Sequence, residues 1–296
     1  MNHFTIRDIE NLCGIKAHTL RTWEQRYKLF VAKRKQSMHR VYDNEDLKEM
    51  LRISFLYHQG HKISKIAALG PRQLHELVEK SCVLDCNHEL FVHQLIEAGL
   101  DFDKEKFEKI VNGLVGRIGL EKCISEVFYP FLHRIGLLWM TNHVVPAQEH
   151  FVSHIIRKKI ILATDGLEQS SQTSAPILLF TPEGEFHEIP LLVINFFFRK
   201  YNNRTVYFGA NVSTDSLRYY MRQHPAGCLY MHVVTHLNNE GLNESINSLC
   251  SEFPIKLVLS GPAINCMAHQ PSNLQVIHSL EELICFAKER GKTISA

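Results

Sequence analysis

The spacing of apolar positions divides the 296-residue chain into three stretches with different expected structures. Between residues 72 and 167, apolar side chains recur every three or four positions, which is the period of an amphipathic helix. This middle stretch is predicted to form a four-helix bundle with a lead-in helix. After a polar linker of sequence EQSSQTSA, the helical period ends, and short apolar runs begin at Ala175.

The last stretch, residues 175–296, contains five apolar runs: PILLFTP, RTVYFGA, GCLYMHVV, IKLVLSG and LQVI. Helical segments alternate with these runs. Near-continuous apolar strands separated by helices indicate a parallel sheet that is covered on both faces. Five strands favour a flavodoxin-like, doubly wound five-stranded parallel sheet, so a Rossmann-like domain is expected at 175–296.

The first stretch, residues 1–71, follows the order helix, turn, helix, basic loop, helix. Thr5 is a plausible N-cap for the first helix, Gly14 ends it, and His18–Tyr27 form the second. Residues 31–42 have no helical period and are mostly basic or polar, which suits an exposed loop or β-wing. The chain is therefore predicted to be multidomain, of α and α/β class, beginning with a winged helix-turn-helix.

The charge is distributed unevenly along the chain. Residues 1–70 contain 13 Lys/Arg and 7 Asp/Glu, whereas the other 226 residues contain 20 and 24. A basic module joined to a mildly acidic body indicates that the N-terminal part is the one that meets a polyanion.

Other features exclude several classes of protein. No apolar run approaches the roughly 20 residues of a membrane span, and the start has no cationic segment leading into an apolar one. The eight cysteines include no CxxC pair, which favours reduced thiols over a disulfide frame or zinc site. We expect a cytoplasmic protein without a membrane partner.

The basic N-terminal stretch carries candidate DNA contacts. In a helix-turn-helix, the second helix enters the major groove while cations of flanking loops hold phosphates. A solvated basic surface is the alternative, but the order of the elements favours DNA binding. Leu20 and Trp23 are expected in the core. The candidate DNA-binding residues are Arg21, Arg26, Tyr27, Lys33, Arg34, Lys35, His39, Arg40 and Tyr42.

Two motifs in this stretch resemble the MerR family of winged helix-turn-helix regulators. TLRTWE at 19–24 fits the family pattern T-[IL]-R-x-[WY]-E, and RVY at 40–42 fits R-x-Y at the end of the wing. The resemblance implies a transcription regulator that binds a double-stranded DNA operator as a homodimer or homotetramer. Metal-sensing members of the family end in a short cysteine-bearing loop, whereas this chain continues for more than 200 residues after the helix that follows the wing.

Candidate ligand-binding residues follow the predicted strands. Glu185 and His187 come after the first strand, at the edge where open α/β sheets bind ligands. A solvated loop histidine is the alternative. The pair resembles the [DE]-x-H-x-x-G motif of cobalamin-binding domains, which implies that His187 ligates cobalt and that Glu185 accepts its other ring proton. Thr235, Leu237 and Gly261 match further family positions, after the third and fourth strands.

This sequence departs from the family pattern at two prolines. Pro190 stands where the first motif has glycine, and Pro262 replaces the second residue of a Gly-Gly pair. Proline fixes φ and lacks the amide hydrogen, so both exchanges alter loops that line the channel for the ligand's nucleotide tail.

The bundle carries a second resemblance, to the CarH- and LitR-like light-sensing branch of MerR-type regulators. Trp139, nine residues, then Glu149 and His150 resemble the motif that surrounds the adenosyl group of adenosylcobalamin. The alternative is ordinary helix packing, but a buried acid–imidazole pair favours a ligand. Met140 replaces the histidine that follows the tryptophan in light sensors, and His143 is a candidate substitute.

Together these resemblances imply a non-enzymatic repressor controlled by cobalamin, as adenosylcobalamin, and through it by light. The bundle at 72–167 would be the helical cap of the cobalamin module. One alternative is a MerR-type regulator with a degenerate, cobalamin-free sensor. Another is a corrinoid carrier of a methyltransferase system, which the basic wing argues against.

Overall fold

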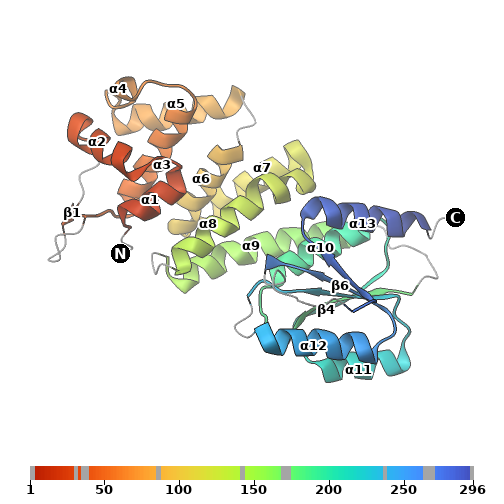
Figure 1. Ribbon diagram of the computed structural model, residues 1–296. Coiled ribbons are helices and arrows are strands. Elements are labelled where there is room, and N and C mark those ends of the chain that lie inside the picture. The colour runs from red at the N-terminus through yellow and green to blue at the C-terminus, as the bar shows by residue number, and fades with distance from the viewer. Residues whose placement is uncertain are drawn as a thin grey trace. The chain divides into compact units, whose positions relative to one another are not determined.

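The computed structural model describes residues 4–29, 33–34, 40–84, 88–140, 144–167, 175–235, 239–262 and 271–293. The chain forms two compact units, residues 1–156 and 157–296, and the division falls within one helix (Figure 1). The three-domain division drawn from the sequence stays a prediction.

The first unit begins with a winged helix-turn-helix. Thr5 and Asp8 form a reciprocal capping box at the start of the first helix, and Gly14 ends it with a φ of +68°. The strands of the wing pair antiparallel, so the predicted β-wing is confirmed. The elements are α1 (Ile6–Cys13), α2 (Ala17–Tyr27), β1 (Lys33–Arg34), β2 (Arg40–Val41), α3 (Asn44–His58) and α4 (Ile63–Ile66).

The core of this module contains both residues that were predicted to lie there. Leu20 and Trp23 are buried, and the Trp23 ring meets Tyr57 edge-on at 4.8 Å between centroids. The predicted DNA contact by Tyr42 is wrong, because this side chain is fully buried. The backbone of Tyr42 exchanges two hydrogen bonds with Phe4, of 2.8 and 3.0 Å, and this bridge holds both residues in the core.

The rest of the unit confirms a four-helix bundle with a lead-in helix. The lead-in helix α5 packs on α3, whereas α6 packs on α7 and α8. The path of α7 breaks at Gly119, whose φ is +78°. The elements are α5 (Pro71–Leu84), α6 (His88–Leu100), α7 (Lys104–Cys123), the π-helical turn η1 (Ile124–Phe128), α8 (Tyr129–Met140) and α9 (Pro146–Asp165).

The second unit is built on a five-stranded sheet whose strands are all parallel. The order β4-β3-β5-β6-β7 is the flavodoxin-like doubly wound order, as predicted. The strands are β3 (Ile177–Pro182), β4 (Thr205–Val212), β5 (Cys228–His232), β6 (Lys256–Ser260) and β7 (Leu274–Ile277). The helices are α10 (Glu188–Lys200), α11 (Thr214–Gln223), α12 (Asn239–Glu252) and α13 (Leu280–Thr293).

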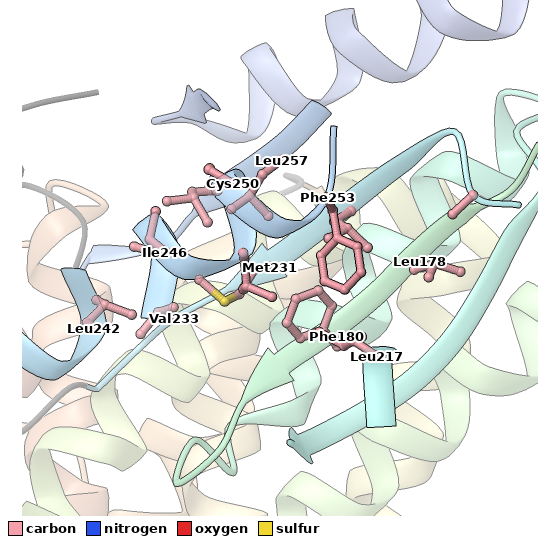
Figure 2. Packing of buried hydrophobic residues seen from close by; sticks show 14 residues of the cluster. Leu178, Phe180, Leu217, Met231, Val233, Leu242, Ile246, Cys250, Phe253 and Leu257 are labelled. Atoms are coloured by element: carbon pink, nitrogen blue, oxygen red, sulfur yellow. The ribbon is translucent and has the colours of Figure 1, made fainter. Parts of the chain in front are cut away.

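Helices cover both faces of the sheet. On one face, Phe180 and Met231 of the strands pack with Leu217 of α11 and residues of α12 (Figure 2). On the other face, the Phe198 ring of α10 lies between Tyr230 and Phe286, with centroids 5.4 and 6.0 Å away. Burial on both faces explains why the strands read as continuous apolar runs. No described helix has both the length and the apolar character of a membrane span.

Candidate functional site

The candidate ligand residues of the second unit gather at the carboxyl edge of the sheet. Glu185 and His187 follow β3, Thr235 follows β5, and Gly261 follows β6. Strand β3 lies between β4 and β5, so the connections from β3 and β5 leave towards opposite faces. This topological switch point is where open α/β sheets bind ligands.

Glu185 and His187 form a hydrogen-bonded pair with unequal exposure. The carboxylate is buried, while half of the His187 side chain, 52%, is exposed. Oε1 of Glu185 accepts hydrogen bonds from the His187 backbone N–H at 2.9 Å and from ring Nδ1 at 2.6 Å. An ionised carboxylate only accepts, so Nδ1 carries the ring proton. In the neutral form of the ring, Nε2 then has a lone pair that can bind a metal ion.

The second oxygen of Glu185 is held by the segment that follows the neighbouring strand β5. Oε2 accepts the backbone N–H groups of Val234, at 2.9 Å, and Thr235, at 2.7 Å. Burial raises the pKa of Glu185, but the N–H groups of His187 and Thr235 and the His187 ring lower it more, so the pKa lies below its ordinary value. The carboxylate is therefore a fixed, charged anchor for the imidazole.

The loop that carries this pair is tied down by residues that the sequence reading missed. The Thr181 hydroxyl donates to the Glu185 carbonyl at 2.6 Å and accepts the Asn211 N–H at 2.9 Å. The Asn211 amide oxygen accepts the Gly184 N–H at 2.8 Å. A threonine at the end of the otherwise apolar run PILLFTP was the available signal for this role.

Gly261 has a conformation and a close contact that require glycine. Its φ is +118°, and a Cβ atom would lie 2.0 Å from the carbonyl oxygen of Val233. This position therefore lets the backbone after β6 approach that after β5. Pro190 lies in the first turn of α10, where its missing N–H removes no intrahelical hydrogen bond.

A histidine beneath this edge was also missed. His232 ends β5, and its Nδ1 lies 2.7 Å from the hydroxyl of Ser260 on β6. Burial lowers the pKa of His232 to about 4, so its ring is neutral at neutral pH. Together with Thr181, these side chains give polar character to the ends of three neighbouring strands.

The bundle residues of the second motif lie at the surface of the first unit. Trp139 is 49% exposed, which is unusual for so large an apolar side chain. Glu149 accepts a hydrogen bond from the Ser153 hydroxyl, and its Oε2 lies 3.6 Å from Nε2 of His150. The expected buried acid–imidazole pair is wrong, because His150 is 77% exposed on the first turns of α9. An exposed indole and imidazole can still contact a ligand.

The candidate DNA contacts on α2 are placed at the surface. Arg21 and Arg26 are exposed, and the Arg26 guanidinium lies 5.5 Å from the centre of the Tyr27 ring. The backbones of Lys33, Arg34 and Arg40 form the strands of the wing. Four residues named from the sequence lie outside the described residues: Lys35, His39, His143 and Leu237.

Two regions of the chain are similar to known protein families. Residues 4–72 match the model of the MerR HTH family regulatory proteins, and residues 92–163 match the model of the B12 binding domain. The HTH-type transcriptional repressors CarH and CarA of Myxococcus xanthus are each 23% identical over 220 residues, or 72% of this chain. These alignments cover 73% of CarH and 70% of CarA.

Among solved structures, the monomethylamine corrinoid protein of Methanosarcina barkeri aligns with 66% of this chain and 96% of its own length, at 10% identity and a TM-score of 0.48. The two family matches define a helix-turn-helix domain followed by a B12-binding domain. This combination makes the chain similar to MerR-type transcription regulators that carry a cobalamin-binding domain.

Proposed function

We propose that this regulator is a repressor whose operator binding is controlled by adenosylcobalamin and reversed by light. The observation that carries the proposal is the Glu185–His187 pair, in which a buried carboxylate lies 2.6 Å from Nδ1 of a half-exposed ring and so orients Nε2 as the nitrogen that the neutral ring offers to a metal ion. This is the arrangement of a second-sphere carboxylate and a metal-binding histidine.

The residues at the carboxyl edge of the sheet would hold a cobalamin. When bound, cobalamin supplies a cobalt ion that accepts a nitrogen ligand and, in the adenosyl form, a cobalt–carbon bond that light cleaves. His187 would provide that nitrogen through Nε2, and Glu185 would keep the ring oriented. At Gly261 an added Cβ atom would collide with the Val233 carbonyl oxygen. The glycine would therefore allow the two backbone segments to lie close together and leave room for a large ligand.

The side chains of Trp139, Glu149 and His150 would contact the adenosyl group. An indole that is half exposed offers an apolar face for stacking, and the imidazole and carboxylate offer hydrogen bonds to a sugar or base. The adenosyl group has both kinds of surface. Met140 removes the histidine that light sensors carry after the tryptophan, so the light response here would depend on loss of the adenosyl group alone.

The ligand would act on DNA binding by changing assembly. A ligand that binds one state of the sensor better shifts the population towards that state. If that state associates as a dimer or tetramer, linked DNA-binding modules gain apparent affinity through their effective concentration. Adenosylcobalamin in the dark is therefore expected to enlarge the oligomer and tighten operator binding, and light is expected to reverse both effects.

The test is size exclusion combined with fluorescence anisotropy on labelled DNA from upstream of the chain's own gene. The protein is measured without ligand, with adenosylcobalamin in the dark, and after illumination. Larger assemblies and tighter binding only in the dark, liganded sample support the proposal. Retained corrinoid with identical elution and affinity in all three samples contradicts the switch. Loss of all corrinoid on desalting would instead identify a degenerate, ligand-free sensor.

A further inference from the structure

One edge of the second unit carries a cluster of cations that the sensor role does not use. Helices α10 and α13 end at the amino edge of the sheet, opposite the candidate cobalamin site, and the loop between α10 and β4 joins them there. The cluster, called the basic edge below, consists of Arg199, Lys200, Arg204, Lys288, Arg290 and Lys292.

A buried side chain and a close approach of two backbone segments fix the loop after α10 against α13. The side-chain amide of Asn203 is buried and donates to the carbonyls of Tyr201, at 3.1 Å, and of Ala287 on α13, at 2.8 Å. A Cβ atom on Gly291 would lie 2.1 Å from the Tyr201 carbonyl oxygen. The end of α13 thus lies directly on the loop that follows α10, and the cations on both segments share one surface.

An aromatic ring lies among these cations. The Lys288 ammonium is 5.1 Å and the Lys200 ammonium 6.0 Å from the centre of the Tyr201 ring. These cation–π contacts favour an extended conformation of the two lysine side chains. Lys200, Arg204, Lys288 and Lys292 are exposed, so their charged ends face solvent.

The charge of the basic edge is not balanced locally. Residues 157–296 contain 12 Lys/Arg and 12 Asp/Glu, yet half of the cations belong to this edge. Glu289 is the acid in the last two turns of α13, and the Arg199 guanidinium donates to the Leu167 carbonyl. Within the described residues, Arg204, Lys288 and Lys292 have no ion-pair partner.

Helix dipoles explain only part of this cluster. Cations are favoured at the C-terminal ends of helices, which accounts for Arg199 and Lys200 in the last turn of α10 and for Arg290 and Lys292 in the last turn of α13. Arg204 instead lies outside both helices, in the loop between α10 and β4, and Lys288 precedes the last turn of α13. An exposed surface of arginines and lysines around a tyrosine has the chemistry that binds phosphate backbones.

We propose that the basic edge is a second, sequence-independent contact with the phosphates of duplex DNA. The inference rests on DNA binding by the N-terminal module, because that module brings the duplex to the chain. Tethering raises the local concentration of phosphates, so weak contacts suffice.

Charge reversal at the basic edge tests the contact on the full-length protein. Anisotropy titrations use fluorescein-labelled random-sequence duplex DNA over a range of salt. Lys288→Glu/Lys292→Glu is expected to lower affinity roughly tenfold near 0.1 M salt and to reduce the slope of log K against log salt by about two. The matched control is Lys158→Glu/Arg222→Glu, which reverses two exposed charges of the same unit outside the basic edge.

A photocrosslinker identifies the partner directly. With benzoylphenylalanine at position 204, ultraviolet light is expected to yield a protein–DNA adduct, and the same group at position 158 is not. An adduct between two copies of the chain, or equal slopes for the double variant and its control, overturns the inference. If the wild-type protein forms no DNA complex at all, the proposed function itself fails, which is a distinguishable result.

Discussion

The ammonium of Lys48 on α3 lies 2.6 Å from both carboxylate oxygens of Asp101, at the end of α6. Lys48 is almost fully buried, and a second pair joins Arg52 to Glu97 at 3.0 Å. These pairs link the helix that follows the wing to the bundle. Because the pairs are partly shielded from water, removing one partner leaves a buried charge behind and costs more than breaking a surface ion pair would.

Asp101→Asn should destabilise the first unit, because Lys48 stays buried with only Glu45 as an anionic partner. We expect a loss of about 1–3 kcal/mol in the free energy of unfolding. Urea unfolding followed by tryptophan fluorescence measures this unit alone, since both tryptophans lie within residues 1–156. Glu105→Gln, at an exposed site nearby, is the control. Equal midpoints for the two variants would show that the pair adds nothing.

The bundle should lose stability in acid through Glu89. Burial raises the pKa of this carboxyl, but His93 and Arg134 lower it more, from 4.5 to about 2. A folded pKa below the unfolded one stabilises the fold above pH 4.5, and this stabilisation is lost as the pH falls towards 2.

The variant Glu89→Gln tests this acid dependence. It should cost about 1 kcal/mol at neutral pH, after allowance for the partial exposure of Glu89, and much less at about pH 3. Urea midpoints of wild type and variant at both pH values measure the difference. A cost that is independent of pH would show that Glu89 acts through packing and not through its charge.

DNA contact and core packing should separate cleanly in the N-terminal module. Arg21 is exposed on α2, so Arg21→Ala should weaken operator binding by about 1–3 kcal/mol without changing the melting temperature. Tyr42 is fully buried, so Tyr42→Ala should lower the melting temperature first. Gel shifts and thermal unfolding measure the two effects. An Arg21→Ala protein with wild-type affinity would remove α2 from the DNA interface.

Apolar periodicity was enough to predict the elements and the order of layers, because both the bundle and the parallel sheet are shaped by burial. What the sequence could not predict depends on contacts between distant backbone groups. Tyr42 is buried because its backbone pairs with Phe4, and Glu185 is fixed by the N–H groups of Val234 and Thr235. Backbone groups leave no side-chain signal, so the motif predicted the histidine and its acid but not what holds them.

Gly261→Ala should damage the ligand edge more than the sheet. A Cβ atom would lie 2.0 Å from the Val233 carbonyl, and φ is +118°, so the loop after β6 must move at a cost of about 1–3 kcal/mol. We expect weaker corrinoid retention with a nearly intact far-ultraviolet circular dichroism spectrum. Gly184→Ala, which has a positive φ but no atom near its added Cβ, is the control. Equal retention by the two variants would argue that close backbone approach at 261 is unimportant.

If His187 binds the cobalt ion, the absorption spectrum of protein desalted after mixing with adenosylcobalamin in the dark should show it. Wild type and the control His224→Ala, at an exposed histidine after α11, should retain corrinoid bands of an imidazole-ligated form. His187→Ala should lose most of the corrinoid. Glu185→Gln should retain less corrinoid than wild type, because a carboxylate no longer orients the His187 ring. Equal retention and identical spectra for wild type and His187→Ala would contradict the account.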